Sequence, residues 1–510
     1  MLSEKKERGD KNLTILSGNA NTWTFLAFLL YLGIVVIIGL ITSRFSSSGM
    51  GEFFLGGRRM KSFVVALAAV SSGRSAWLVI AVSGMAFIRG ASAIWAVTGY
   101  ILMELFLFIF PGRRLRYFTE KMDNLTIPDY LESRLGDKTN LIRIFSLIPI
   151  LVFMVAYVSA QFNAGGKTLA SSFNLTRFEG VLITSGIVLF YTMMGGFLAV
   201  CLTDLIQAML MIFALLILPF IAILDYGGLQ ALFSSLKELS PQHIDPFAIS
   251  LGTFLSFIGI GLGSPGNPHI LNKYMSIDDP ERLKITGFIG TLWNVIMGWG
   301  AVYIGLAGRA FYRDLSLLPD QDAENIFTLL GSKHLHPFLF GLTLSAIFAA
   351  IMSTADSQLL VASSAIVRDT YQKILARGKE ISEKTLVFWS RLVTLIITLV
   401  ALVFGALATK LVFYLVLFAW GGLGAAFGPS ILLSLYWKKL TKWGVIAGII
   451  SGTATEIVWY SIPELKAVIS EWVPATLLSF ITVVSVSLMT FPPENAERML
   501  EIMKGESKGG

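Results

Sequence analysis

The chain has 510 residues, of which 55% are hydrophobic and only 14% are charged. A soluble domain carries about 25% charged residues, so this composition excludes a soluble globular protein and indicates one that crosses a membrane many times. The single cysteine, Cys201, excludes an internal disulfide framework. The net charge of +7 comes from lysines and arginines in short loops, which is typical of loops facing the cytoplasm and does not indicate a nucleic-acid partner.

Hydropathy predicts an all-α polytopic membrane protein with about 13 transmembrane helices. A polar N-terminal tail, residues 1–22, lacks the features of a signal peptide. The spans are expected in chain order at 23–43, 62–90, 93–116, 141–163, 178–198, 203–225, 246–267, 284–311, 335–367, 386–408, 411–436, 443–461 and 471–491. A second tail, residues 492–510, follows the last span.

Loop charges predict the orientation of the chain. An odd number of spans places the two termini on opposite sides. Arginine and lysine clusters such as 113–116 and 438–442 face the cytoplasm if the N-terminus is outside. Lys5 and Lys6 in the N-terminal tail favour the opposite orientation, but the total number of lysines and arginines in the loops favours an outside N-terminus. We therefore expect a multi-pass protein of the cell inner (plasma) membrane, with the N-terminus outside and the tail 492–510 in the cytoplasm.

The span predicted at 62–90 is polar at its centre, where it reads Val70-Ser-Ser-Gly-Arg-Ser-Ala-Trp77. Serine and glycine propagate a helix poorly, and backbone groups freed within hydrocarbon have no water to bond. An arginine at this depth costs roughly 2.5–3.5 kcal/mol on insertion scales. We expect a broken helix that lines a transport site. The simpler alternative is two short helices with Arg74 reaching an interface.

The span predicted at 246–267 is interrupted as well, because glycine and proline crowd the run Gly259-Ile-Gly-Leu-Gly-Ser-Pro-Gly-Asn-Pro-His269. Its G-x-G-x-x-G pattern follows no strand, so it does not indicate a nucleotide site. The two broken spans lie five spans apart and so cross the membrane in opposite directions. Paired interrupted helices mark the central site of transporters. This pattern predicts an inverted repeat, 62–225 against 246–436, with an extra first helix at 23–43 and two last spans within 443–491.

Hydroxyl groups gather in the span predicted at 335–367. Ala350, Ser353 and Thr354 stand at i, i+3 and i+4, so they share one helix face. A carbonyl near Ala350 and two hydroxyls would form half of an all-oxygen site, which suits a hard cation such as sodium. The alternative is that the hydroxyls only allow close helix packing.

Acidic residues also lie inside the predicted spans. Asp204 could complete a cation site, pair with an arginine, or be a simple interfacial residue. An intramembrane charge needs a partner, and the expected partners of Arg74 are Asp204 and Asp356. Glu104 and Glu456 have no evident role. No histidine lies in the middle of a span, so a histidine proton relay is not expected.

These residues resemble the sodium/solute symporter family, most closely the bacterial sodium/proline symporters, from about residue 25 to 490. The resemblance implies 13 helices, an outside N-terminus and a LeuT-type 5+5 inverted-repeat core. The matching stretches are Phe54–Arg58, Thr126–Tyr130, Gly195–Gln207, Pro268–Leu271, Ser345–Thr354, Ala419–Trp420 and Gly424–Pro429.

The resemblance also implies a set of site residues. The shared sodium ion of the family would bind carbonyls near Ser71, Arg74 and Ala350 and the hydroxyls of Ser353 and Thr354. Asp204 matches an aspartate that holds a further sodium ion in some members. The implied substrate-binding residues lie at the two breaks and on the span at 411–436, and they are Ser75, Trp77, Ile260, Ser264, Pro268, Phe418 and Trp420.

Two departures from the proline symporters bear on function. Those proteins carry Asp-Met at the positions of Gly73-Arg74, and the aspartate supports their use of sodium. A guanidinium delivers a fixed positive charge, so Arg74 could act as a cation surrogate in a sodium-independent or proton-coupled carrier or exchanger. Ile260 and Ser264 replace aromatic residues that help to enclose proline, so the pocket could be roomier or more polar.

The expected function is secondary-active, sodium-coupled import of a small organic solute, an amino acid such as proline, by alternating access. A channel or a transporter-like receptor is the alternative of another class. The expected partners are the solute, Na⁺ and the lipid bilayer, without nucleic acid or an obligate protein partner. No cofactor other than Na⁺ is expected. The sequence shows no metal cluster, P-loop or catalytic triad, so an enzyme is not expected.

Overall fold

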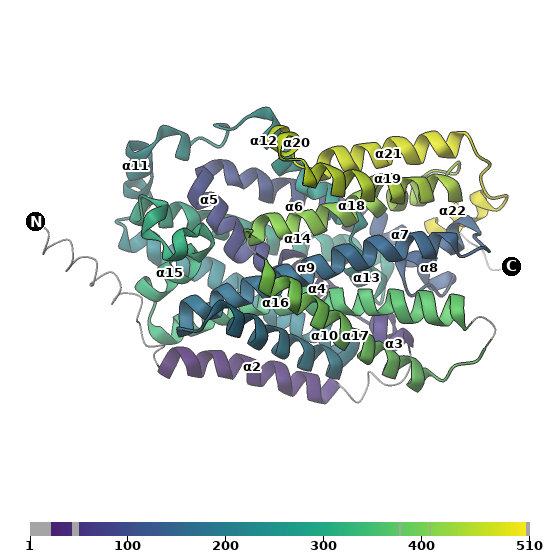
Figure 1. Cartoon of the computed structure of the whole chain (residues 1–510), viewed down its shortest axis with the longest axis horizontal. Helices are drawn as coiled ribbons and strands as arrows, with labels where there is room; N and C mark the ends of the chain where they lie inside the picture. The colour runs from purple at the N-terminus through teal and green to yellow at the C-terminus, as the bar shows by residue number, and fades with distance from the viewer. Residues whose placement is uncertain (1–21, 43–49, 377–378, 409, 506–510) are drawn as a thin grey trace, which may run out of the picture.

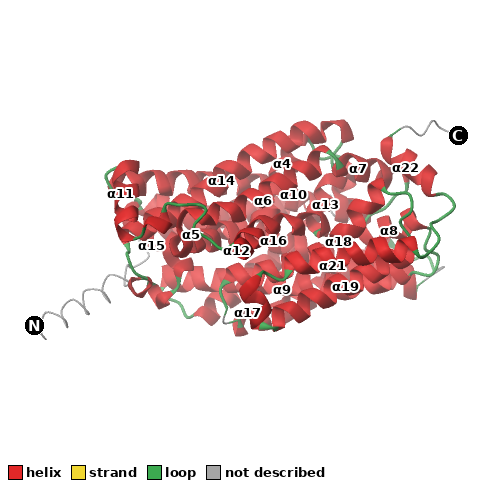
Figure 2. Cartoon of the chain, turned by 90° about the horizontal axis from the view of Figure 1, so that it is seen from above, coloured by secondary structure: helices red, strands yellow, loops and turns green. Residues whose placement is uncertain are grey.

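The computed structural model describes residues 22–42, 50–376, 379–408 and 410–505. Of the two predicted tails, 1–22 lies outside these residues except for Thr22, and 492–510 lies outside them from residue 506 onward. The described part is helical, with one isolated β-bridge between Met60 and Ile277 and no strand (Figure 2). The predicted all-α class is confirmed.

The helices of the first half lie close to the predicted spans. They are α2 (Thr22–Thr42), α3 (Met50–Leu55), α4 (Ser62–Ala76), the π-helical η2 (Trp77–Val82), α5 (Ser83–Arg89), α6 (Ile94–Ile109), α7 (Pro111–Lys121), α8 (Ile127–Leu135), α9 (Leu141–Phe173), α10 (Arg177–Asp225) and α11 (Leu229–Leu239).

The second half follows the same pattern. Its helices are α12 (Leu251–Ile258), the 3₁₀-helical η5 (Gly259–Gly266), α13 (Pro268–Met275), α14 (Leu283–Phe311), α15 (Ile326–His334), α16 (Pro337–Ser364), the π-helical η10 (Ala365–Leu375), α17 (Glu383–Leu407), α18 (Val412–Tyr436), α19 (Lys442–Ser461), α20 (Pro463–Val468), α21 (Trp472–Leu488) and α22 (Ala496–Lys504).

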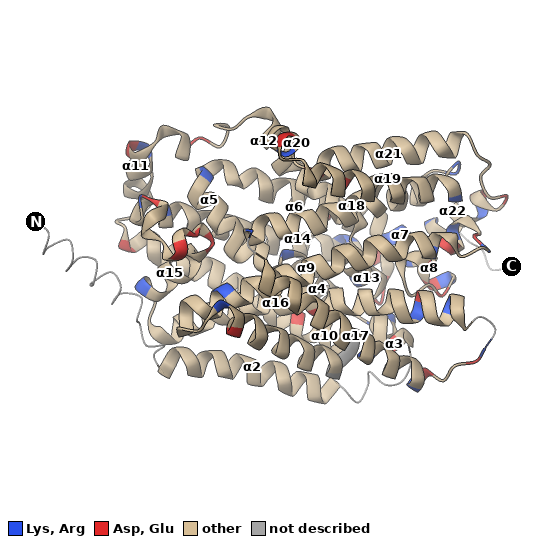
Figure 3. Ribbon diagram, in the orientation of Figure 1, with Lys and Arg blue, Asp and Glu red and all other residues tan. Residues whose placement is uncertain are grey.

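Eight helical stretches among the described residues are long and apolar enough to cross a membrane, and two shorter apolar stretches, Leu251–Gly266 and Trp472–Leu488, accompany them. The count of about 13 spans stays a prediction. Long helices run along the longest axis of the molecule, with α11 and α15 at one end and α8 and α22 at the other (Figure 1). Charged residues gather at these two ends, and only a few lie between them (Figure 3).

Helix α10 covers two of the predicted spans, 178–198 and 203–225. The Tyr191 hydroxyl lies 3.4 Å from the carbonyl of Ala199 and also contacts the Thr203 hydroxyl. Residues twelve positions apart in a straight helix are about 18 Å apart. The helix must therefore bend sharply between Tyr191 and Thr203, and its two parts correspond to the two predicted spans.

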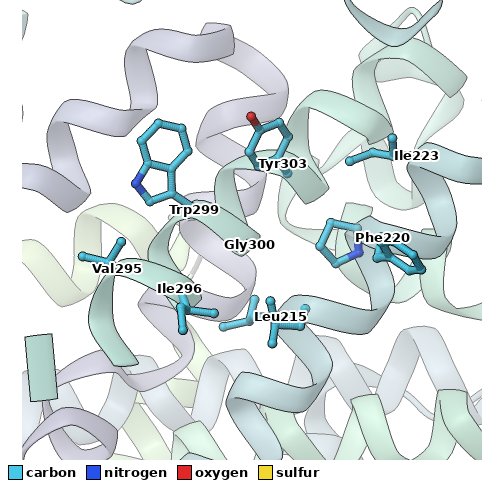
Figure 4. A pocket seen from close by; sticks show the side chains of 10 residues that line it. Leu215, Phe220, Ile223, Val295, Ile296, Trp299, Gly300 and Tyr303 are labelled. Atoms are coloured by element: carbon cyan, nitrogen blue, oxygen red, sulfur yellow. The ribbon is translucent and has the colours of Figure 1, made fainter. Parts of the chain in front are cut away.

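Helices α10 and α14 enclose an apolar groove of about 420 Å³ (Figure 4). Trp299 and Tyr303 line it from α14, and Leu215 and Phe220 line it from α10. A Cβ atom on Gly300 would lie 2.0 Å from the carbonyl oxygen of Leu215, so glycine is required where the two backbones approach. Phe220 is 60% exposed, as expected of a side chain that faces lipid.

Candidate functional site

The first predicted break is a single residue. Ser75 has φ 50° and ψ −175°, a conformation that costs about 1–3 kcal/mol and recurs at functional sites. The helical turns therefore end at Arg74 and restart at Ala76. The freed backbone N–H of Ala76 donates to the Gln161 side chain of α9 at 3.1 Å. The backbone N–H of Trp77 donates both to the Ser75 hydroxyl at 3.1 Å and to the Arg74 carbonyl.

Oxygen atoms of α4 and α16 meet just before this break. The Ser353 hydroxyl lies 3.1 Å from the carbonyl oxygen of Ser71 and 3.2 Å from that of Ala350. The Thr354 hydroxyl donates to the carbonyl of Ser72 at 2.9 Å. The structure thus brings the residues expected at the sodium site together, and their donor atoms are the neutral oxygens that suit a hard monovalent cation. The Arg74 carbonyl accepts the backbone N–H of Trp77 instead.

The Arg74 side chain does not lie against these oxygens. Its Nε donates to Asn294 of α14 at 2.6 Å, and a terminal nitrogen forms an ion pair with Glu104 of α6. The guanidinium also stacks over the ring of Tyr100. Both charged side chains are buried, at 1% and 2% exposure. The expectation that Arg74 pairs with Asp204 or Asp356 is therefore wrong in this structure, because Glu104, which sequence reasoning gave no role, is the nearer acid.

Asp204 has a different partner. Its Oδ2 lies 2.7 Å from Nζ of Lys273 on α13, and both side chains are fully buried. The Ser72 hydroxyl donates to the same oxygen at 3.1 Å. Sequence reasoning missed Lys273 because the span was expected to end at residue 267, whereas α13 continues the buried chain to Met275. The nearby Ile270, Leu271, Tyr274 and Met275 were the signal that could have extended the span.

The second predicted break lies at η5 and the extended residue Asn267, before α13 starts at Pro268. The Trp420 indole N–H of α18 donates to the carbonyl of Ile260 at 2.9 Å. The Tyr100 ring centroid lies 5.8 Å from that of Trp420 and 6.1 Å from that of Trp77. Aromatic residues therefore connect the two breaks, and Tyr100, which was not predicted as a site residue, joins Trp77 to Trp420.

Polar atoms around these aromatic residues are buried without hydrogen-bond partners. They belong to Ser264, Gln161, Trp77 and both ring nitrogens of His269. Buried polar groups are nearly always hydrogen-bonded in proteins, so these atoms are available to bond a polar solute or water. Tyr157 and His269 flank Trp420, with centroid distances of 6.5 and 6.3 Å, and neither was predicted as a site residue.

Phe418 does not join this cluster. Its ring packs on Tyr460 at 4.3 Å and on Phe153 at 5.4 Å, and it lines a separate, largely apolar groove of about 660 Å³ between α9, α17, α18 and α19. Residues two positions apart in an α-helix are separated by about 200° around the helix axis. Phe418 and Trp420 therefore lie on opposite faces of α18, and the structure does not bring Phe418 together with the other residues expected at the substrate site.

Replacing Gly263 with alanine is expected to destabilise the protein by about 1–3 kcal/mol, because a Cβ atom there would lie 2.0 Å from Nε1 of Trp420. Thermal unfolding in detergent measures the effect. Gly186 of α10 is the matched control, since a Cβ atom there would have nothing within 4 Å. Equal unfolding temperatures for the two alanine variants would contradict the close packing of η5 on α18.

Two broken membrane helices that meet buried oxygens and unsatisfied polar groups define a secondary transporter. The sequence profile of the Sodium:solute symporter family matches residues 53–452, and the chain belongs to this family. It is therefore a sodium-coupled solute symporter, a multi-pass membrane transporter and not an enzyme.

Curated relatives agree with this assignment. The chain is 39% identical to the high-affinity proline transporter PutP of Bacillus subtilis, over 88% of this chain and 95% of the relative. It is 36% identical to the sodium/proline symporter of Escherichia coli, over 93% of this chain and 95% of the relative.

Solved structures confirm the predicted LeuT-type fold. A Na⁺-coupled sialic acid symporter matches with a TM-score of 0.77 at 19% identity, covering 93% of this chain and 99% of that chain. The nucleobase-cation-symport transporter Mhp1 matches with a TM-score of 0.53 at 12% identity, over 88% and 98% of the two chains.

Proposed function

We propose that this protein is a sodium/proline symporter of the plasma membrane that works by alternating access. The observation that carries the proposal is the buried contact of the Ser353 hydroxyl with the carbonyls of Ser71 and Ala350, directly before the break at Ser75. The two curated relatives are a proline transporter and a sodium/proline symporter, which supports proline as the solute.

The proposed sodium ligands are the carbonyls of Ser71, Arg74 and Ala350 and the hydroxyls of Ser353 and Thr354. These residues come from α4 and α16, two helices far apart in the chain. An ion bound by both helices stabilises the arrangement in which they are close. Sodium therefore shifts the equilibrium between outward- and inward-open states by its differential affinity for them.

The proposed solute site lies between the two breaks. The half-helix that restarts at Ala76 presents its N-terminus, and the positive end of a helix dipole attracts a carboxylate. The aromatic rings of Trp77, Tyr100 and Trp420 offer apolar faces to a compact ring such as that of proline. Ile260 and Ser264 lie on the η5 side of this space, and Ser75 and Pro268 mark the two breaks.

The inverted repeat of 62–225 against 246–436 and the outside N-terminus belong to the same proposal. In each segment the first spanning element is the broken one, at Ser75 and at Asn267. Rocking of the elements around the breaks against the remaining helices would expose the solute site to either side in turn.

Proteoliposomes containing the purified protein are expected to accumulate labelled proline when an inward sodium gradient is imposed at equal pH. A potassium gradient of the same size is the control and is expected to give no accumulation. Proline uptake that ignores sodium would instead favour the carrier with Arg74 as cation surrogate. Absence of proline uptake, with a sodium-dependent thermal shift for another amino acid, would assign a different solute.

A further inference from the structure

A buried cluster beside the proposed sodium ligands contains two carboxylates and one ammonium group. Asp204, Lys273 and Asp356 come from α10, α13 and α16, and each is fully buried. The Lys273 ammonium lies 2.7 Å from Asp204, so these two charges cancel. Among the described residues, no cation lies within ion-pair distance of Asp356. With all three groups ionised, the cluster carries a net charge of −1.

Only one of the two carboxylate oxygens of Asp356 has a hydrogen-bond partner. Its Oδ1 accepts the backbone N–H of Ser357 at 2.5 Å, whereas its Oδ2 is buried without a hydrogen-bond partner. One oxygen of Asp204, Oδ1, is likewise buried without a partner. An isolated carboxylate in a protein interior is strongly unfavourable, so a cation must accompany it or a proton must neutralise it.

Hydrogen bonds through Ser357 and Ser72 connect Asp356 with Thr354, one of the proposed sodium ligands. The hydroxyls of Ser357 and Ser72 are 3.2 Å apart, and the carbonyl of Ser72 accepts the Thr354 hydroxyl at 2.9 Å. Asp356 also stands three residues after Ser353 on α16, so the two side chains share a helix face. The Asp356 carboxyl group thus lies close to the neutral oxygens that are proposed to hold sodium.

We propose that Asp356 is the counter-charge of the coupled sodium ion. The ion pair between Lys273 and Asp204 then keeps this second aspartate from binding another sodium ion. This inference rests on the proposed function and adds a stoichiometry to it. Neutral carbonyls and hydroxyls alone would leave a buried positive charge uncompensated, whereas one nearby carboxylate makes the loaded cluster neutral. Each transport cycle then carries one sodium ion.

The first experiment measures how sodium activates labelled-proline binding to the purified full-length protein at fixed pH. Replacing Asp356 with asparagine is expected to raise the half-activating sodium concentration at least about tenfold, which corresponds to about 1.4 kcal/mol. Glu456→Gln is the matched control, because Glu456 of α19 is also a fully buried acid without a hydrogen-bond partner. The control is expected to change the value less than about twofold.

An unchanged sodium requirement in the D356N variant would overturn the proposal, as would binding that responds to pH in place of sodium. Should the wild-type protein bind no proline, the proposed solute is wrong, yet Asp356 is still tested. Sodium alone is then expected to raise the thermal stability of the wild-type protein and of E456Q, but not that of D356N.

The second experiment counts ions. Simultaneous uptake of ²²Na and labelled proline into proteoliposomes is expected to give a ratio of about one. The double variant Lys273→Met with Asp204→Asn removes both members of the neutral pair, and it is expected to keep that ratio. A ratio near two in the wild-type protein would overturn the role given to Lys273.

Discussion

Replacing Arg74 with methionine is expected to lower the free energy of unfolding by about 3–5 kcal/mol, because the substitution leaves the Glu104 carboxylate buried without its cation. Asn294 still donates to Glu104 in this variant, but an amide cannot cancel the charge. Thermal unfolding of the detergent-purified protein measures the loss.

The double variant Arg74→Met with Glu104→Leu is the control for this experiment. It removes both buried charges together, and replacing a buried ion pair with apolar residues is often neutral or stabilising. Most of the lost stability is therefore expected to return. If the double variant is as unstable as Arg74→Met alone, packing over the Tyr100 ring and not charge pairing is the main role of Arg74.

The same double variant separates the two roles that the sequence left open for this arginine. If Arg74 serves as a cation surrogate, its removal should increase the dependence of uptake on sodium. The structure pairs its guanidinium with Glu104 and Asn294, so we expect sodium dependence equal to that of the wild-type protein. Labelled-solute uptake over a range of sodium concentrations distinguishes the two results.

The positions of the helices and their breaks were predictable because the signals are local. Twenty or so consecutive apolar residues predict a span wherever they occur. The breaks at Ser75 and Asn267 follow from nearby serine, glycine and proline, which weaken a helix regardless of its neighbours. The sharp bend of α10 separates two hydrophobic runs, 178–198 and 203–225, that hydropathy resolves without knowledge of the fold.

The partners of buried charges were not predictable in the same way. Glu104 and Asn294 stand 30 and 220 residues from Arg74, and only the packing of α4 against α6 and α14 brings them together. From the sequence alone, any acidic residue inside a span was an equally good candidate for the ion-pair partner of Arg74. Lys273 was missed for a different reason, since a span expected to end at residue 267, before Pro268, excluded the buried half-helix that follows.

The separation of Phe418 from Trp420 was predictable from the sequence. Its two-residue separation from Trp420 already places the two side chains on opposite faces of a helix. The resemblance to the family implied that both residues bind the substrate, whereas helical periodicity places only one of them on a given face of α18. By contrast, the spacing of Ala350, Ser353 and Thr354 on one face led directly to the oxygen cluster that the structure contains.

Replacing Ser353 with alanine is expected to raise the sodium concentration for half-maximal uptake roughly 10- to 100-fold. The variant loses a hydroxyl that lies 3.1 Å and 3.2 Å from the carbonyls of Ser71 and Ala350. A hydrogen-bonding or ligating group that faces a charge is worth about 1.5–3 kcal/mol. Sodium titration of labelled-proline uptake in proteoliposomes measures the change.

Ser345→Ala is the matched control on the same helix, since the buried Ser345 hydroxyl donates only to the carbonyl of Gly341 within α16. It is expected to leave the sodium requirement unchanged. Because coupling between two ligands is reciprocal, saturating sodium should restore the proline affinity of the Ser353→Ala variant. Equal shifts in both variants, or a loss of proline affinity that sodium does not restore, would place the cation away from the contact between α4 and α16.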